Sequence, residues 1–395
     1  MSLYRYQIEN LDPGASVNLR AENPLAAGTA RRLSIVMVGM HLEKTRGGIT
    51  TLTAGILNSA INDDHEVTYI ASQAEDFGSL RKFLLAVWAL VRFTAACLFF
   101  RPDLVYVHVG SNASLYRESI FILLAKIFGI RVLTHFHAGD LDNYYPFQPV
   151  VGRRYIAYAL GLSDRLIAVS QESARQLRLL NDASTIVVVP NALDTAVFGV
   201  ASDRATAGDH GEIVKLLFVG AMGKLKGEKD LIDALGLLKD ESLSLKVSML
   251  GYGAESLKQV FDEKGIGSMV NFLGAVTLSE RIAFYKEADI FVLPTYAEAM
   301  PISVIEAMAA GLAVVTTAVG GIPEIIDDGS EGLLVPEGKV PILAQKISFL
   351  AKNRAIRLAM GKKARARVRE QMNFTNYIKS LDKEIRQVCK VPRGI

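Results

Sequence analysis

Cysteine is almost absent from this chain of 395 residues, which contains only Cys97 and Cys389. Two cysteines cannot form a disulfide framework in a chain of this length, which excludes the class of small disulfide-stabilised secreted domains. Residues 1–30 are polar and lack the apolar stretch of a secretory signal. We therefore expect a loose tail over residues 1–30 and a cytoplasmic protein.

The chain also lacks a large excess of charge of either sign. Its 44 lysines and arginines and 41 acidic residues leave a formal net charge of +3. Without a concentrated basic patch or a recognition motif, this charge predicts no nucleic-acid partner. Half of the residues are hydrophobic, so a chain of this length can bury two ordinary cores, and we predict two domains.

One long apolar run, FLLAVWALVRFTAACLFF at Phe83–Phe100, tests the expectation of a soluble protein. A membrane span would bury Arg92 near the bilayer centre, at a cost of about 2.5–3.5 kcal/mol on insertion scales. The favoured interpretation is a helix packed in the core. The alternative is a helix that also touches a membrane surface, which the flanking Arg81, Lys82 and Arg101 support. A span is the least favoured interpretation.

From Leu33 onward, short β-branched runs alternate with stretches that are compatible with helices. These runs are too apolar on both faces for an antiparallel sheet, which predicts parallel strands. They lie in two sets, at 33–38, 66–70, 104–109, 130–136, 166–170 and 185–189, and at 215–219, 245–250, 269–273, 290–293, 313–317 and 332–335. The stretches between them are long enough for right-handed crossovers. The predicted class is α/β, with two doubly wound, Rossmann-like domains in tandem.

Composition sets the domain boundaries. The first domain is predicted over residues 31–190 and the second over 213–372, with a linker rich in Gly, Ala, Asp and Thr at 191–212. The amphipathic segment at 373–395 is predicted to form a helix that packs back on the first domain. The basic run at 361–370 is interpreted as a solvated helix face, with anionic lipid contact as the alternative.

Ligands of open parallel sheets bind beyond the carboxyl ends of the strands. The segment TYAEAMPISVIEAMAAG, residues 295–311, directly follows the predicted strand at 290–293. Pro301 suits the first turn of a helix, whose free amides attract an anion or hydroxyl oxygens. Glu298 precedes this turn and Glu306 lies inside the helix. A carboxylate that only stabilised the helix would lie in its first turn. We therefore predict two acceptors for hydroxyl groups of one ligand, with a structural pair bonded to the backbone as the alternative.

Two glycine-rich turns follow other predicted strands. The first contains Gly220, Gly223 and Gly227, with Lys226 as a charge for a phosphate. Lys224 or Lys226 alone would more often be a solvated surface lysine, and the Gly-Lys-Ser/Thr of a Walker loop is missing. Gly47 and Gly48 open the first helix of the first domain. Their spacing does not make Gly-x-Gly-x-x-Gly, which disfavours a dinucleotide-dependent dehydrogenase.

A histidine pair follows the fourth predicted strand in the sequence THFHAGD. Strand alternation turns His135 and His137 to the same face, and His137 is closer to the cleft. Asp140 follows them. Zinc would need a third and a fourth ligand beyond the two histidines, and none is evident in the sequence. No metal site is predicted.

Together these motifs resemble glycosyltransferase family 4, the retaining nucleotide-sugar transferases of the GT-B fold. They occur in the family's order between Leu33 and Phe374. They are the glycine pair at 47–48, VPNALD at 189–194, FVG......KG at 218–227, the Glu-x7-Glu stretch at 298–306 and VGGIPEII..GSEGLLV at 319–335. The resemblance implies two Rossmann-like domains that face a central cleft.

The resemblance also implies roles for individual residues. His137 and Glu298 are the catalytic residues, with His137 beside the reacting carbon and Glu298 on the transferred sugar. Glu306 holds the ribose hydroxyls of the donor and Lys226 neutralises its pyrophosphate. The remaining donor-binding positions are Gly47, Gly48, Ala299, Met300, Pro301 and Ile302. The family has an arginine where this chain has Ala221, so either Lys224 contacts the phosphate in its place or phosphate binding is weaker.

The function implied is retaining transfer of a sugar to a glycan, a lipid-linked or a small-molecule acceptor in polysaccharide or glycoconjugate biosynthesis. No cofactor and no metal are expected, and peripheral contact with the inner face of an anionic membrane is an open option. The alternatives are a nucleotide-sugar 2-epimerase and a catalytically silent nucleotide-sugar binder. A double displacement with Glu298 as the nucleophile is the alternative mechanism. The sequence does not predict the base, the sugar or the acceptor.

Overall fold

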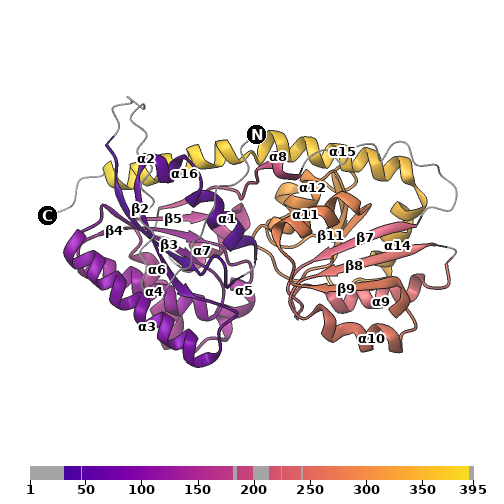
Figure 1. Cartoon of the computed structure of the whole chain (residues 1–395), viewed down its shortest axis with the longest axis horizontal. Coiled ribbons are helices and arrows are strands. Elements are labelled where there is room, and N and C mark those ends of the chain that lie inside the picture. Colours follow the sequence, from indigo (N-terminus) through magenta and orange to yellow (C-terminus); the bar gives the residue numbers. More distant parts are fainter. Residues whose placement is uncertain are drawn as a thin grey trace.

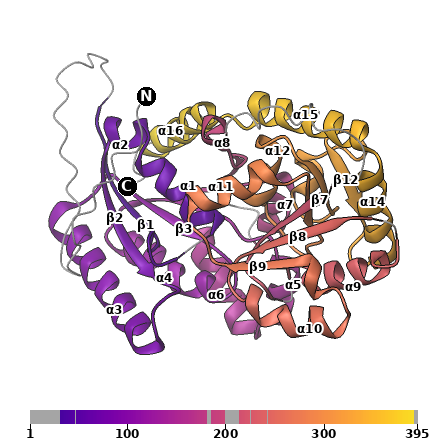
Figure 2. The ribbon, with the colours of Figure 1, turned by 45° about the vertical axis from the view of Figure 1, so that its right-hand side comes forward.

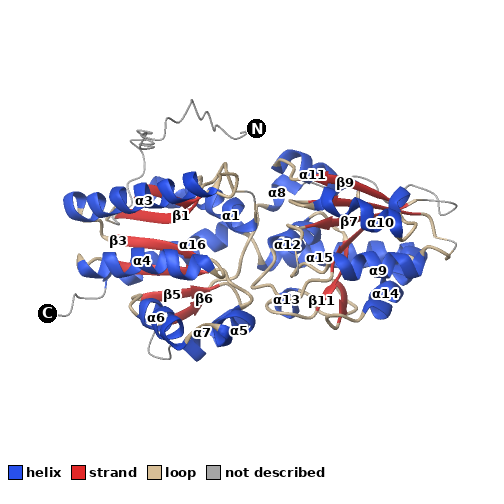
Figure 3. Ribbon diagram, turned by 90° about the horizontal axis from the view of Figure 1, so that it is seen from below, coloured by secondary structure: helices blue, strands red, loops and turns tan. Residues whose placement is uncertain are grey.

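The computed structural model describes residues 31–45, 47–180, 185–198, 213–223, 225–241 and 243–390. The predicted tail at 1–30, Lys224 and the linker beyond residue 198 lie outside these ranges. The described residues form two α/β domains that lie side by side along the long axis (Figure 1). Figure 3 shows helices on both faces of each sheet, as a doubly wound fold requires.

The first domain is built on six parallel strands in the order β2-β1-β3-β4-β5-β6. Their bounds are β1 Ser34–Met40, β2 Glu66–Gln73, β3 Leu104–Val109, β4 Arg131–Phe136, β5 Arg165–Ala168 and β6 Ile186–Val188. The chain reverses its direction of travel across the sheet between β1 and β3. This switch point opens a crevice at the carboxyl ends of the strands.

The second domain repeats this plan with the strand order β12-β11-β10-β7-β8-β9, again all parallel. The strands are β7 Val214–Val219, β8 Leu245–Leu250, β9 Val270–Gly274, β10 Ile290–Leu293, β11 Ala313–Thr317 and β12 Gly332–Val335. Its switch point lies between β7 and β10. All twelve predicted strand runs coincide with observed strands to within a few residues, and the α/β fold class is confirmed.

Short crossover helices connect the strands. In the first domain they are α1 Gly48–Leu57, α2 Ala60–Asp64, α3 Ser79–Ala95, α4 Ala113–Ile127, α5 Leu141–Tyr144, α6 Val150–Gly161 and α7 Gln171–Leu180. The connecting helix α8 is Thr195–Phe198, and the second domain contains α9 Glu228–Leu238, α10 Lys258–Glu263, α11 Leu278–Glu287, α12 Ile302–Ala309, α13 Ile322–Ile325 and α14 Val340–Lys352. Thr277 and Glu280 form the capping box that starts α11.

The apolar run at 83–100 forms most of α3 and the π-helical turn Ala96–Phe100 that continues it. The run is helical as predicted, but the prediction that this helix is packed in the core is wrong for most of the surface of the helix. Only Ala89, Phe93 and Cys97 are buried, at a spacing of four residues, which is one stripe of the helix. Phe83 is 65% exposed and most other large apolar side chains of this helix also face outward. A single sheet face covers one side of a crossover helix, so uniform apolarity leaves the rest uncovered.

The chain ends in two long helices, α15 Arg354–Gln371 and α16 Phe374–Lys390. They run along one side of the molecule, and α16 lies against the first domain (Figure 1). His65 Nε2 and the Asp382 carboxylate are 2.7 Å apart, and Arg165 of β5 forms an ion pair with Glu384. The C-terminal segment therefore ties the second domain back to the first.

Candidate functional site

A cleft of about 420 Å³ lies between the two domains, at the carboxyl ends of their strands. It collects the predicted residues from both halves of the sequence. Those that line it are Gly47, Gly48, His137, Lys226, Glu298, Ala299, Met300, Pro301, Ile302 and Glu306. A groove of similar size between α9 and α14 contains none of them. Of the predicted site residues, only Lys224 lies outside the described part of the chain.

Two helix N-termini meet in this cleft. Pro301, with φ −72° and ψ 117°, starts α12, and Gly47 starts α1. A Cβ atom on Gly48 would lie 3.0 Å from the Ile302 side chain, so the starts of α1 and α12 lie close together. Figure 2 shows α1 next to the α11 and α12 region of the second domain. The first-turn amides of a helix have no intrahelical partner and carry partial positive charge. Their convergence favours an anionic group between the domains.

Glu298 lies in the loop between β10 and α12 and forms an ion pair with Lys226. The distance between Lys226 Nζ and Glu298 Oε1 is 2.5 Å. Glycines hold this loop in place: a Cβ on Gly320, where φ is +55°, would lie 1.6 Å from the Glu298 carbonyl oxygen. A Cβ on Gly139 would lie 2.0 Å from the Ala299 nitrogen. Backbone from both domains therefore packs directly against this loop of the second domain.

Glu306 lies in the wall of the cleft, within α12, and is 1% exposed. Its Oε1 accepts a hydrogen bond of 2.8 Å from Arg281 Nη2. Burial raises the pKa of the Glu306 carboxyl, and the Arg281 guanidinium opposes that rise. Each of the two predicted carboxylates therefore faces a cation at the cleft.

Arg281 is a site residue that the sequence analysis missed. It lies in the first turn of α11, directly after the capping box of Thr277 and Glu280. That capping box fixes where α11 begins, and it is the signal that places Arg281 near the carboxyl end of β9. Ala221 also lines the cleft. Among the described residues that line the cleft, Lys226 is the one lysine and Arg281 the one arginine.

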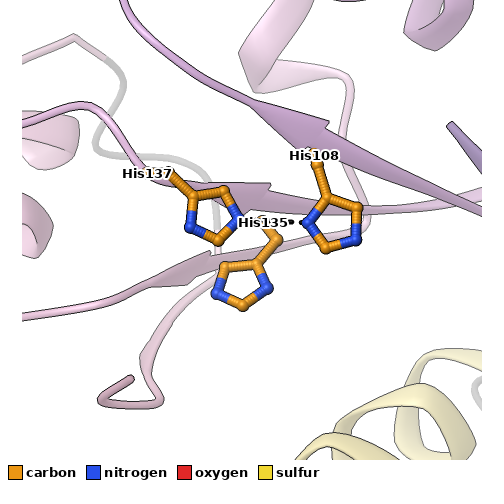
Figure 4. Close-up of side chains that lie close together, drawn as sticks. All are labelled: His108, His135 and His137. Atoms are coloured by element: carbon orange, nitrogen blue, oxygen red, sulfur yellow. Dashed lines mark hydrogen bonds between the residues drawn. The ribbon is translucent and has the colours of Figure 1, made fainter. Parts of the chain in front are cut away.

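Three histidines lie together in the first domain, at the edge of the cleft (Figure 4). His135 and His137 stack with ring centroids 4.1 Å apart, which confirms that they share a face. His108 of β3, which the sequence analysis missed, places its Nδ1 3.0 Å from His137 Nε2. The Tyr106 hydroxyl lies 2.8 Å from His135 Nδ1.

One ligand nitrogen from each of these histidines lies within 4.8 Å of the others, a spacing that raises the question of a metal. The rings, however, are stacked at interplanar angles of 18–29°. A metal ion lies in the plane of each imidazole that binds it, so stacked rings do not direct their lone pairs to one point. This arrangement favours two separate hydrogen bonds, Tyr106 to His135 and His108 to His137, over a metal centre.

Two Rossmann-like domains that face each other across a cleft define the GT-B class, and comparisons with known proteins agree. Residues 46–197 match the family model of Glycosyltransferase Family 4, and residues 200–367 match that of Glycosyl transferases group 1. The chain belongs to glycosyltransferase family 4. The resemblance found in the motifs is thereby confirmed.

Curated relatives include D-inositol 3-phosphate glycosyltransferases. That of Corynebacterium jeikeium is 32% identical over 219 residues, which cover 51% of this chain and 52% of the relative. That of Arthrobacter sp. is 34% identical over 211 residues, which cover 51% of this chain and 50% of the relative. The chain is thus matched to about half the length of these curated relatives.

Solved structures share the fold over most of the chain. Sucrose-phosphate synthase from Thermosynechococcus elongatus superimposes with a TM-score of 0.78 at 19% identity, covering 90% of this chain and 99% of that one. HepE from Anabaena in complex with UDP-glucose gives a TM-score of 0.72 at 16% identity, with 90% and 100% coverage. These similarities show the GT-B fold.

Proposed function

We propose that the protein transfers a sugar, with retention of configuration, from a nucleotide-sugar donor to a glycan, lipid-linked or small-molecule acceptor. One observation carries the proposal: Lys226 and the N-termini of α1 and α12 converge on the cleft that Glu298 and Glu306 also line. Amides and an ammonium suit a diphosphate, and carboxylates suit sugar hydroxyls. The curated relatives are glycosyltransferases, and HepE binds UDP-glucose in its solved complex.

In the proposed mechanism, charge develops on the diphosphate as its bond to the sugar breaks. Lys226 and the first-turn amides of α12 stabilise that charge. Glu306 accepts hydrogen bonds from the ribose, and Glu298 from the sugar. The leaving phosphate takes the proton of the acceptor hydroxyl on the same face of the sugar, so configuration is retained. No metal ion or cofactor is required in this scheme.

Turnover of labelled nucleotide sugars tests the assignment of the site. UDP-sugars are the first donors to try, because HepE binds UDP and UDP-glucose in its complexes. Lys226→Ala should reduce kcat by about a hundredfold or more, since a charge-stabilising contact of the transition state is lost. Lys229→Ala, an exposed lysine on the neighbouring α9, is the matched control. Unchanged turnover in both Lys226→Ala and Glu306→Ala would contradict the assignment.

The product separates the proposal from its alternatives. Transfer predicts a new glycosidic bond that appears only when an acceptor is present, with the anomeric configuration of the donor by NMR. A 2-epimerase would give its product without an acceptor, and a silent binder would bind the nucleotide tightly with no turnover. Activity that persists in excess chelator supports metal-independent chemistry. A sugar adduct trapped on Glu298 would instead support double displacement.

We further propose that the protein works at the inner face of a membrane and binds there through α3. Its outward face presents Leu80, Phe83, Leu84, Val87, Trp88 and Val91, each at least 42% exposed. This is the one helix in the described ranges that is long and apolar enough to cross a membrane. The buried stripe of Ala89, Phe93 and Cys97 fastens α3 to the first domain, which favours a helix lying on the bilayer over a span.

Charge supports an anionic bilayer as the occupant of this face. Residues 79–101 contain Arg81, Lys82, Arg92 and Arg101 and no acidic residue. Each such cation near an anionic leaflet contributes about 1 kcal/mol to binding. Apolar side chains of Ile127 in α4 and Val151 in α6 are also exposed, and α4 packs against both α3 and α6.

The single tryptophan of the chain, Trp88, lies on this face. Its fluorescence should shift to the blue and be quenched by brominated lipid when anionic vesicles are added, and rising salt should weaken the effect. Phe83→Asp should abolish the shift, whereas Leu237→Asp should not, because Leu237 is an exposed leucine on α9 of the second domain. If vesicles cause no shift of the Trp88 fluorescence, membrane binding is contradicted. It is also contradicted if self-association of the protein, without vesicles, produces the same shift.

A further inference from the structure

The contact between His108 and His137 joins the interior of the first domain to the cleft. His108 is 4% exposed in β3, and His137 follows β4 and lines the cleft. Their ring nitrogens, Nδ1 of His108 and Nε2 of His137, are 3.0 Å apart (Figure 4). Burial lowers the pKa of His137 well below its usual value and that of His108 to about 3. Both imidazoles are therefore neutral.

In a bond between two neutral imidazoles, one ring must donate and the other must accept. His108 Nε2 is buried and has no partner among the described residues. If His137 donated, the proton of His108 would sit on this Nε2 as a buried N–H without an acceptor. Orphaned buried N–H groups are rare, whereas an unfilled acceptor is tolerated more often. The favoured arrangement places the proton of His108 on Nδ1.

We infer that His108 is a positioning residue that fixes the tautomer of His137. Because His137 Nε2 accepts from His108, the proton of the neutral His137 ring is on Nδ1. His135 stacks on the His137 ring and helps to hold its plane. His137 thus presents an N–H donor at the cleft.

The role of the His137 N–H in catalysis rests on the proposed function, whereas the tautomer itself does not. With a nucleotide sugar bound, the His137 N–H donates to an oxygen of the donor, either a sugar hydroxyl or a phosphate oxygen. It does not accept the proton of the acceptor hydroxyl, because Nε2 already accepts from His108 and Nδ1 already carries a proton. That proton goes to the leaving phosphate, as the same-face mechanism requires.

The tautomer is measured directly by two-bond proton–nitrogen correlation NMR on protein with ¹⁵N-labelled histidine. The chain has six histidines, so His108→Asn and His137→Gln suffice to assign the two signals. We expect both rings of the native protein to carry their proton on Nδ1. A His137 signal with its proton on Nε2 would overturn the inference. This NMR measurement needs no substrate, so its result does not depend on whether the proposed function is correct.

Kinetics then test the positioning role. Asn at position 108 can donate from its side-chain nitrogen roughly where Nδ1 lies, so His108→Asn should keep most activity and the Nδ1–H tautomer of His137. His108→Leu removes the donor, frees His137 to adopt either tautomer and should lower kcat about tenfold with little change in thermal unfolding. Equal activity and equal His137 spectra in both variants would contradict the role. If both variants unfold, the spectrum of the native protein still decides.

Discussion

At the scale of single residues, the site pairs each carboxylate with a cation. Glu298 faces Lys226 and Glu306 faces Arg281. Ala221 lacks the charge that the family carries at its position, and Arg281 is the second fixed cation that the described cleft offers. The Arg281 side chain is 14% exposed, so water screens its charge only partly. Arg281 is therefore well placed to keep Glu306 in its charged, accepting form.

Replacing Arg281 tests this point through pH. Burial raises the pKa of Glu306 while Arg281 opposes the rise, and Tyr285 is the other titratable group against this carboxyl. In Arg281→Met the pKa should rise further, so Glu306 takes up a proton at a higher pH and loses its acceptor role. The donor KM should then increase as pH falls, by about ten- to a hundredfold, starting at a higher pH than in the native enzyme. Arg281→Lys is the control, and identical pH profiles would contradict this account.

At the scale of elements, a carboxylate of one domain caps a helix of the other. Glu324 in α13 accepts hydrogen bonds of 2.9 Å from the Gln171 amide and 3.0 Å from the Glu172 amide, at the start of α7. A carboxylate at a helix N-terminus stabilises it by about 1 kcal/mol. This bond gives the motif at 319–335 a physical role, which is to hold the two domains together across the cleft.

Glu324→Ala should therefore loosen the interface. We expect faster hydrogen exchange at the amides of Gln171 and Glu172, and a larger radius of gyration by small-angle scattering. Glu370→Ala, an exposed glutamate on α15, should change neither. Unaltered exchange at the start of α7 in Glu324→Ala would show that the cap does not hold the domains together.

The elements themselves were predictable, and the contacts between distant elements were not. Strand runs such as 104–109 are apolar on both faces, which is a local signal of a buried parallel strand. Pro301 and the capping box at Thr277 likewise mark helix starts within a few residues of sequence. His108, Arg281 and Glu324 escaped notice because their roles depend on partners 25 or more residues away. The apolarity of α3 predicted burial, but the fold provides a covering surface on one side only.

At the scale of the whole molecule, α16 joins the end of the chain to the first domain. Asp382 of α16 is half-buried, which favours its neutral form, but hydrogen bonds from Arg386 and His65 outweigh burial and hold its pKa below the usual value. A carboxylate with a lowered pKa stabilises the fold at neutral pH, and this stabilisation is lost as pH falls through its folded value.

Asp382→Asn should accordingly lower the free energy of unfolding by about 1 kcal/mol at pH 7, since the pair is partly exposed to water. The gap in unfolding free energy between variant and native protein should narrow as pH falls below about 4, because the unfolded chain takes up a proton there while the native carboxylate, with its lowered pKa, keeps its charge to lower pH. Urea unfolding at several pH values measures both effects. Asp240→Asn, at an exposed site in the second domain, is the control. If the difference in unfolding free energy between Asp382→Asn and the native protein grew at low pH, the proposed stabilisation by this carboxylate would be contradicted.

A crystal structure with a bound nucleotide sugar tests the central claim most directly. The account predicts the diphosphate between Lys226 Nζ and the first-turn amides of α12, with the ribose at Glu306 and the sugar between Glu298 and His137. Lys226 should leave Glu298, its partner in the present structure, to reach the phosphate. A nucleotide bound elsewhere, with Glu298 still paired to Lys226 and neither Glu298 nor Glu306 in contact with the nucleotide, would contradict the account.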